Sequence, residues 1–219
     1  MNLVLLGPPG CGKGTQAERL RHKLDLVHLS TGDMLRAEVA AGTEIGRMVD
    51  GLMRAGALVP DELIIGIAAS RFDHDDVRKG FLLDGFPRTV PQAQALDEML
   101  RTRHLKLDAV VSIDVNDDEM VERITGRFTC AKCGALYNDH AKPTKVEGVC
   151  DACGSKEFVR RKDDTAETVR RRLVAYRDQT SPLFEYYERA GLLRHVDGMG
   201  GIDDVTRAMF SAIGSEAWG

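Results

Sequence analysis

Short apolar runs alternate with longer amphipathic stretches along most of the chain. The apolar runs predict strands at residues 3–6, 26–29, 81–84, 109–115 and 192–196. Apolar positions that recur at helical spacing predict helices at residues 15–24, 61–72, 91–103, 117–125, 165–189 and 203–213. Strands that alternate with helices of this length are typical of strand–helix–strand units. The pattern therefore predicts an α/β fold with a five-stranded parallel sheet flanked by helices.

Two of the expected helices carry a capping signal at their start. Asn116 is followed by Glu119, and Asp164 is followed by Glu167. A short polar residue with an acidic residue three positions later satisfies free N–H groups of a first helical turn. We therefore expect helices to begin just after Asn116 and just after Asp164.

Two segments interrupt the alternation. Residues 30–59 look like two helices in succession and contain several glycines, which predicts a small helical insertion. Residues 127–163 are rich in Cys, Gly, Lys and Arg, and are too long for an ordinary connection. The expected organisation is a core of residues 1–29, 60–126 and 164–219 with two inserted lobes.

Composition narrows the function classes. The chain has 219 residues, a hydrophobic content of 43% and a formal net charge of −4. One main domain is expected at this length. A general nucleic-acid binder needs clustered and uncompensated basic residues, so nucleic acid is not an expected partner. Without a basic leader or a stretch of 18 apolar residues, we expect a soluble cytoplasmic protein with no membrane partner.

The first expected strand runs into the glycine-rich segment GPPGCGKGT, residues 7–15. Glycines let successive backbone N–H groups turn inward, and the helix that follows adds its positive end, which suits bound phosphates. Gly7, Gly12 and Lys13 have the spacing of a P-loop, but Gly14 follows the lysine and the hydroxyl arrives one place late at Thr15. The segment predicts a nucleotide-handling phosphotransferase.

This form of the loop resembles that of adenylate kinases and their nucleoside monophosphate kinase relatives. Further segments resemble the family in the same order: STGDMLR at 30–36, FLLDGFPRT at 81–89, RKDD at 161–164 and ETVRRRL at 167–173. The resemblance covers essentially the whole chain and is closest to bacterial-type adenylate kinases with a long lid. It implies a P-loop core, an AMP-binding insertion at 30–59 and a lid at 127–163.

The resemblance also implies roles for individual residues. For ATP it implies Gly10, Cys11, Gly12, Lys13, Gly14, Thr15, Arg123, Arg127, Leu136, Tyr137 and Gly200. For AMP it implies Thr31, Arg36, Ala57, Leu58, Val59, Gly85, Phe86, Pro87, Arg88, Gln92, Arg161 and Arg172. For phosphoryl transfer it implies Lys13, Arg88, Arg123, Arg161 and Arg172, since a guanidinium binds phosphate bidentately and keeps its charge in a dry site. Asp33 and Asp84 are implied to organise Mg²⁺ through its water shell, because Mg²⁺ favours few carboxylates plus phosphate oxygens.

Simpler interpretations stand beside some of these roles. Asp33 could instead cap a helix that starts at Met34. Gln92 could be an ordinary exposed helix residue. Arg172 is one of three successive arginines, so its assignment depends on helical register. His28 is read as a packing residue without a role, and Cys11 as an oxidation-sensitive position in the loop.

The two cysteine pairs in residues 127–163 predict a metal site. Sixteen residues separate the pair Cys130 and Cys133 from the pair Cys150 and Cys153, and a glycine follows each pair. This spacing is typical of a closed, tetrahedral four-thiolate site with a structural metal; two disulfides or four free thiols are the alternatives. Zinc is expected, while iron or cobalt also accept four sulfurs. A short polar lobe needs such a source of folding free energy.

Together these features predict reversible transfer from Mg·ATP to AMP, giving two ADP, by direct in-line transfer with arginine clamping and lid closure. Nucleotides are the expected partners, and the family precedent is a monomer. A kinase of another base, such as a UMP/CMP or GTP-using relative, is the nearest alternative. A metal-ribbon nucleic-acid binding module and a P-loop regulatory protein without catalysis are the alternatives from other classes.

Overall fold

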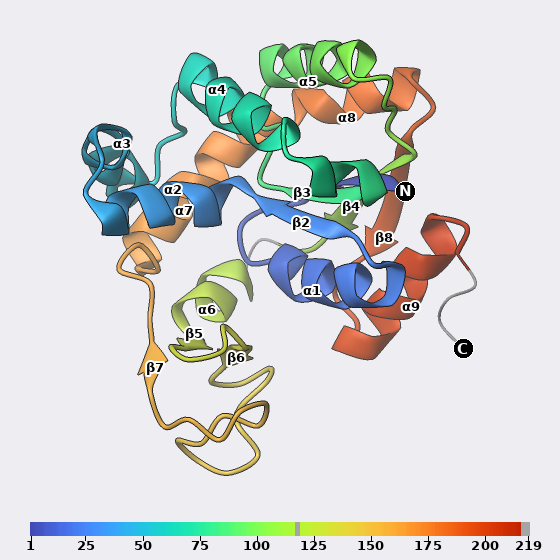
Figure 1. Ribbon diagram of the computed structural model, residues 1–219. Coiled ribbons are helices and arrows are strands. Elements are labelled where there is room, and N and C mark those ends of the chain that lie inside the picture. The colour runs from blue at the N-terminus through green and yellow to red at the C-terminus, as the bar shows by residue number, and fades with distance from the viewer. Residues whose placement is uncertain (117–118, 216–219) are drawn as a thin grey trace.

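The computed structural model describes residues 1–116 and 119–215 and has a parallel sheet at its centre (Figure 1). Its five strands lie in the order β2-β3-β1-β4-β8, and every neighbouring pair is parallel. The strands are β1 (Asn2–Leu6), β2 (Val27–Ser30), β3 (Phe81–Asp84), β4 (Ala109–Asp114) and β8 (Leu193–Asp197). The predicted fold class is confirmed, and each strand bound differs from the predicted one by at most one residue.

Helices cover both faces of this sheet (Figure 1). On one face lie α1 (Lys13–Leu24) and α9 (Ile202–Ala212), and on the other lie α4 (Asp61–Phe72), α5 (Val90–Thr102) and α8 (Pro182–Arg189). A short 3-10 helix, η1 (Asp75–Lys79), leads into β3. No helix in the described part of the chain is long and apolar enough to cross a membrane.

Alternation along the strands divides the core into two layers. In β1, Val4 and Leu6 belong to the apolar cluster under α4, α5 and α8, whereas Leu3 and Leu5 belong to the cluster under α1 and α9. All four are at most 3% exposed. Strands that are buried on both faces read as continuous apolar runs, which is the pattern that the sequence shows. The sheet is therefore a rigid base, and polar residues at the carboxyl ends of its strands share one edge.

The segment between β2 and α4 is the predicted helical insertion. It consists of α2 (Thr31–Ala41) and α3 (Glu44–Ala55). The hydroxyl of Ser30 accepts a hydrogen bond from the backbone N–H of Asp33 and caps α2. The expectation that Asp33 caps a helix beginning at Met34 is therefore wrong, because α2 begins three residues earlier and Asp33 lies within its first turn.

The cysteine-rich segment folds around a small antiparallel sheet that the sequence did not predict. Its strands are β5 (Arg127–Cys130), β6 (Leu136–Asn138) and β7 (Phe158–Val159), in the order β6-β5-β7. Phe128 stacks on Tyr137 with ring centroids 5.5 Å apart, and Phe158 meets both rings edge-on. The strands are too short to show hydrophobic periodicity, which is why the pattern missed them.

Two helix starts and one helix length differ from the sequence prediction. Thr165, not Asp164, caps α7 (Ala166–Ala175), because its hydroxyl accepts from the backbone N–H of Thr168. The long helix predicted at 165–189 is broken by a π-helical turn, η3 (Tyr176–Thr180), so that α8 begins only at Pro182. The start expected after Asn116 falls on residues 117–118, outside the described residues, and α6 spans Met120–Thr125.

Candidate active site

The glycine-rich loop connects β1 to α1 at the carboxyl edge of the sheet. Gly7, Gly10 and Gly12 have φ values of 141°, 88° and 98°, which side chains disfavour. Gly7 has a second constraint, since a Cβ there would lie 2.6 Å from the Cys11 sulfur. The Lys13 ammonium donates to the carbonyls of Gly7 and Pro8 at 2.7 and 3.0 Å. The loop thus has the geometry of a phosphate-binding loop, with its lysine folded over it.

The loop opens into a cavity of about 710 Å³ that reaches the insertion and the lobe at 127–163. Nearly all the residues expected at the nucleotide sites line it. They are Gly10, Cys11, Gly12, Lys13, Gly14, Thr15, Thr31, Asp33, Arg36, Ala57, Leu58, Val59, Asp84, Gly85, Pro87, Arg88, Gln92, Arg123, Arg127, Leu136, Tyr137, Arg161, Arg172 and Gly200. Phe86 is the exception, because its ring is 0% exposed in the core cluster beneath α4 and α5. Its side chain therefore does not line the cavity, and the assignment of Phe86 to the AMP site stays a prediction.

Asp84, at the end of β3, lies on the floor of this cavity. Burial by itself raises the pKa of Asp84, but His28 and the charges of Lys13 and Arg88 outweigh it and hold the pKa below its usual value. His28 Nε2 lies 3.6 Å from Asp84 Oδ2 and has no hydrogen-bond partner among the residues that the structure describes. Sequence analysis gave His28 no role, and its position two residues before the end of β2 was the available signal. Asp84 is therefore an ionised carboxylate at the meeting point of several positive groups.

Arg88 and Gln92 form the wall opposite the loop. Gln92 is 2% exposed, so the interpretation as an exposed helix residue is wrong. Its side chain accepts from the Arg88 backbone N–H at 2.8 Å and donates to Asp61 at 2.7 Å. Arg88 donates to the Gly85 carbonyl at 2.8 Å, and burial lowers the pKa of its guanidinium. These bonds fix both side chains at the start of α5.

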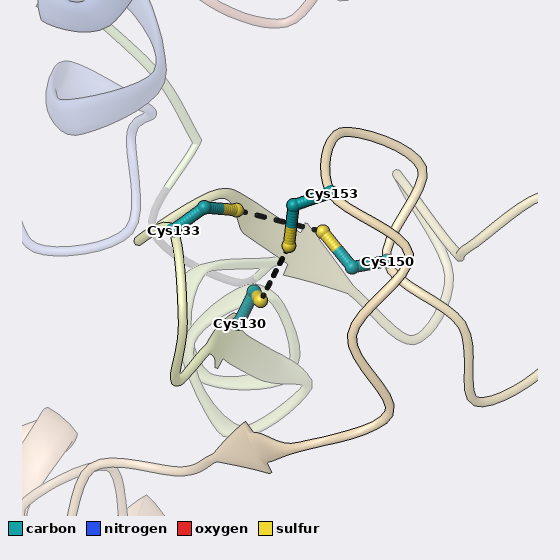
Figure 2. A group of neighbouring side chains, drawn as sticks. All are labelled: Cys130, Cys133, Cys150 and Cys153. Atoms are coloured by element: carbon teal, nitrogen blue, oxygen red, sulfur yellow. Dashed lines mark hydrogen bonds between the residues drawn. The ribbon is translucent and has the colours of Figure 1, made fainter.

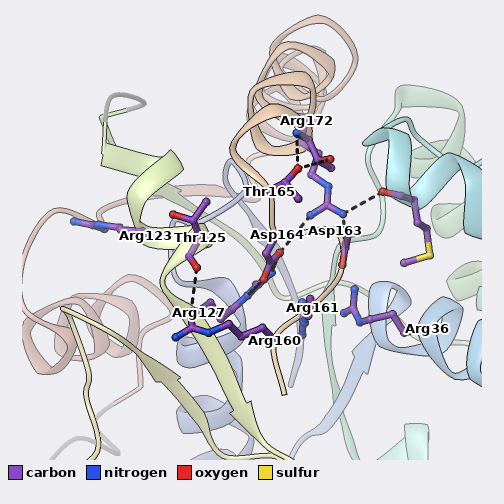
Figure 3. A network of polar contacts seen from close by, with 12 residues as sticks. Arg36, Arg123, Thr125, Arg127, Arg160, Arg161, Asp163, Asp164, Thr165 and Arg172 are labelled. Carbon is purple, nitrogen blue, oxygen red and sulfur yellow. Dashed lines mark hydrogen bonds and ion pairs between the residues drawn. The ribbon is translucent and has the colours of Figure 1, made fainter. Parts of the chain in front are cut away.

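Arginines from four elements converge beside this wall, with carboxylates between them (Figure 3). Arg127 makes a two-point contact with Asp164 at 2.6 and 2.9 Å, and Arg172 pairs with Asp163. Arg172, one of three successive arginines, lines the cavity, so the register of α7 is compatible with its expected role.

Arg36 and Arg161 both contact Asp33, at 2.5 and 3.4 Å. The contact of Arg161 with Asp33 joins the segment just after β7 to the helical insertion. Burial and the neighbouring arginines lower the pKa of Arg161 to about 10. Like charges held this close need an anion between them.

On the other side of the loop the cavity is bounded by α6, β6 and the turn before α9. Leu136 approaches the phosphate loop, since a Cβ on Gly14 would lie 3.6 Å from its Cδ1 atom. Lys142 also lines the cavity, with its ammonium 5.2 Å from the ring centre of Tyr137. Sequence analysis missed Lys142, which carries no motif of its own and reaches the cavity only through the fold of the lobe.

The four cysteine sulfurs lie within 4.8 Å of one another (Figure 2). Cys130 and Cys153, and Cys133 and Cys150, have sulfurs 3.6 Å apart, and none of the four forms a disulfide. Backbone and tyrosine donors point at the sulfurs: the Tyr137 hydroxyl lies 3.3 Å from the Cys150 sulfur and is the leading cause that lowers the pKa of that thiol to about 6.

This cysteine arrangement fits a closed structural metal site. Four thiolate ligands leave no position open for a substrate.

Phosphate-binding groups extend through one cavity from the loop to the arginines of the opposite wall. The molecule is therefore a phosphotransferase of the P-loop class, built on an α/β core.

Comparison with known proteins narrows this class. The family model described as adenylate kinase matches residues 5–192. The adenylate kinase of Paramagnetospirillum magneticum is 57% identical over 209 residues, which cover 95% of this chain and 96% of that protein. The adenylate kinase of Zymomonas mobilis is 53% identical over 94% of this chain and 92% of its own, and that of Rhizobium etli is 52% identical over 97% and 99%. The chain belongs to the adenylate kinase family, and it is a nucleotide-binding transferase of the nucleoside monophosphate kinase class.

Proposed function

We propose that the protein transfers a phosphoryl group reversibly from Mg·ATP to AMP and so forms two molecules of ADP. One observation carries the proposal: a single cavity holds a phosphate loop at one end, a buried hydrogen-bonding wall at the other, and arginines between them. A phosphoryl transfer enzyme has little covalent work to do, and must hold donor and acceptor oxygens in line and neutralise their charge. The arrangement is suited to that task.

The donor ATP occupies the loop side of the cavity. The backbone N–H groups of residues 10–15 bind its phosphates, and Lys13 leaves the carbonyls of Gly7 and Pro8 to bridge them. Arg123 and Arg127 lie beside these phosphates, while Leu136, Tyr137 and Gly200 enclose the nucleoside. Cys11 contributes its backbone, because its thiol is buried against the loop and burial raises its pKa.

The acceptor AMP occupies the side between α2 and α5. Arg36 and Arg88 bind its phosphate, and Thr31, Gln92 and the backbone of residues 57–59 and 85–87 recognise its nucleoside. The Gln92 amide already bonds Arg88 and Asp61, so it presents its remaining hydrogen-bonding capacity in one fixed direction. A fixed amide discriminates between bases better than a mobile one, because a wrong base leaves it unpaired.

Arg88, Arg123, Arg161 and Arg172 surround the transferring group together with Lys13. The pairing of Arg172 with Asp163 and of Arg161 with Asp33 supports this role, because each guanidinium already has an anionic partner at the cavity. Entry of a phosphate exchanges a carboxylate partner for the nucleotide. Because the groups are already placed, little reorganisation is left for the chemical step.

Asp33 and Asp84 are the residues that would hold Mg²⁺ through its water shell. The burial and ionised state of Asp84 fit this role, since Mg²⁺ retains several waters and uses few carboxylates. When bound with ATP, the ion neutralises phosphate charge. In the lid, a structural Zn²⁺ would be held by Cys130, Cys133, Cys150 and Cys153, because Zn²⁺ is bound tetrahedrally by four thiolates. Iron and cobalt are the alternatives.

Closure of two lobes, residues 30–59 and 127–163, over the core of residues 1–29, 60–126 and 164–219 completes the mechanism. The Asp33–Arg161 contact links the edges of both lobes. Closure brings the arginines onto the phosphates and excludes water, which would otherwise accept the phosphoryl group.

A coupled assay for ADP tests the proposal. ATP is offered with AMP, UMP, CMP and GMP in turn, and GTP is offered with AMP; ADP formation that needs both ATP and AMP is the expected result. Preference for UMP or CMP, or for GTP, would replace it with another kinase of the class. Nucleotide binding without any transfer would indicate a regulatory protein. Binding of DNA or RNA at moderate salt, without transfer, would favour the nucleic-acid module.

A further inference from the structure

The C-terminal end of α3 rests against α7, although 114 residues separate the two contacting positions. The last carbonyls of α3 need partners here, among them those of Leu52, Met53 and Arg54. The helix ends in a glycine turn: the N–H of Ala57 donates to the carbonyl of Leu52, and that of Gly56 donates to the carbonyl of Met53. This turn leaves the carbonyl of Arg54 without a donor from its own helix.

Thr168 of α7 supplies the missing donor. Its hydroxyl donates to the Arg54 carbonyl at 3.1 Å and accepts from the Thr165 hydroxyl at 3.0 Å. Thr168 is only 3% exposed, so this bond is shielded from water. Arg172, one turn further along α7, reaches the Met53 carbonyl at 3.5 Å. Two side chains of α7 therefore cap α3 from outside.

Gly56 shows how close this docking is. A Cβ at Gly56 would lie 2.9 Å from the backbone oxygen of Thr168 and 3.2 Å from its methyl group. The φ of 74° at Gly56 also favours glycine. Residues 57–59 follow at once and line the cavity on its acceptor side. The position of these three residues is therefore set by the contact between Gly56 and Thr168.

We infer that Thr168 is a positioning residue for the acceptor site: it fixes the end of α3 on α7 and so places the backbone of residues 57–59 for AMP. This inference rests on the proposed function for the identity of the acceptor. Thr168 itself does not line the cavity, so its effect passes through α3. Its loss weakens acceptor binding and leaves donor binding as it was.

The test compares Thr168→Val, which removes only the hydroxyl group, with Thr168→Ser, which keeps it. By calorimetry, Thr168→Val is expected to raise the dissociation constant for AMP about fivefold, the effect of one neutral hydrogen bond, and to leave that for ATP within twofold. Thr168→Ser restores AMP affinity. Thr102→Val is the matched control, because the Thr102 hydroxyl also bonds backbone carbonyls, those of Glu98 and Met99, at the far end of α5.

Unchanged AMP affinity in Thr168→Val, or an equal loss of ATP and AMP affinity, overturns the inference. Gly56→Ala probes the same contact from the other side and is expected to weaken AMP binding in the same selective way, so the inference stays testable if Thr168→Val fails to fold. Calorimetry needs no turnover. A wild-type protein that binds AMP but forms no ADP would refute the proposed function alone, and an active protein indifferent to Thr168→Val would refute this inference alone.

Discussion

Gln92→Leu removes a buried amide that bonds Arg88 and Asp61 and is proposed to bind the acceptor base. The effects on stability and on acceptor binding can both be estimated. The substitution leaves the Arg88 N–H without its acceptor at 2.8 Å and the Asp61 carboxylate without its donor at 2.7 Å. A buried N–H without a partner costs about 1 to 3 kcal/mol, and a bond to a charged group contributes about 1.5 to 3 kcal/mol. Asp61 keeps its bond from Thr89 and is half-buried, which moderates the second loss. We expect the free energy of unfolding to fall by about 2 to 4 kcal/mol.

Thermal unfolding and steady-state kinetics separate the two effects. A loss of this size lowers Tm by about 4 to 16 °C in a chain of this length. Loss of the bond to the acceptor base raises the KM for AMP at least about tenfold, which corresponds to about 1.4 kcal/mol. The KM for ATP is expected to stay constant. Gln94→Leu, two residues along α5 and exposed, is the matched control and should change neither quantity.

Either half of this reasoning can be refuted by itself. An unchanged KM for AMP would remove Gln92 from the acceptor site, whatever happened to stability. An unchanged Tm would show that Arg88 and Asp61 find other partners at no cost. A rise in the KM for ATP equal to that for AMP would indicate a general distortion of α5.

Three further predictions concern the lobe at residues 127–163. Removal of the lid metal with a chelator is expected to lower Tm while ADP formation continues at temperatures below the new transition; an unchanged Tm would contradict a structural role for Cys130 and its three partners. Tyr137→Phe is expected to speed metal release to a chromogenic chelator about 10- to 100-fold, since the hydroxyl contacts the Cys150 sulfur, whereas Tyr186→Phe should not. Burial raises the pKa of Asp163, but the bond and charge of Arg172 outweigh it and hold the pKa below 3.8. The ionised form therefore stabilises the fold above about pH 4, and this contribution is lost as the pH falls through the lowered pKa. In urea unfolding, Asp163→Asn should be less stable than the wild type at pH 7. Between pH 5 and pH 2 the variant should lose less stability than the wild type does.

The core of the fold could be predicted because its signals are local. The strands β1, β3 and β4 are buried on both faces and appear as apolar runs, and the phosphate loop is a contiguous segment with a required lysine. The failures occur where tertiary contacts decide. Asp164 carries a good capping signal but is drawn into a pair with Arg127, and Thr165 caps α7 in its place. The break at Tyr176–Thr180 is followed by Pro182 at the start of α8, and this proline is the local signal that the helical pattern at 165–189 overrode.

The candidate site could be predicted where residues belong to motifs, and not where the fold alone brings them together. Phe86 belongs to a motif, yet its ring packs in the core cluster beneath α4 and α5. His28 and Lys142 belong to no motif and still line the cavity. Thr168 lies within a motif, but its contact with Arg54 could not be read from sequence, since the need for a donor arises only from the way α3 ends.

The carboxylates among the arginines explain how such a site stays folded without its ligand. Several guanidiniums in one cavity repel one another, and the lowered pKa of Arg161 reports that repulsion together with burial. Asp33, Asp163 and Asp164 offset it, and two of the three lie in the segment that follows β7. In the proposed mechanism a nucleotide phosphate takes the place of these acids beside the arginines. Because the acids lie in that segment and on α2, we expect phosphate binding and the proposed closure of the two lobes to depend on the same ion pairs.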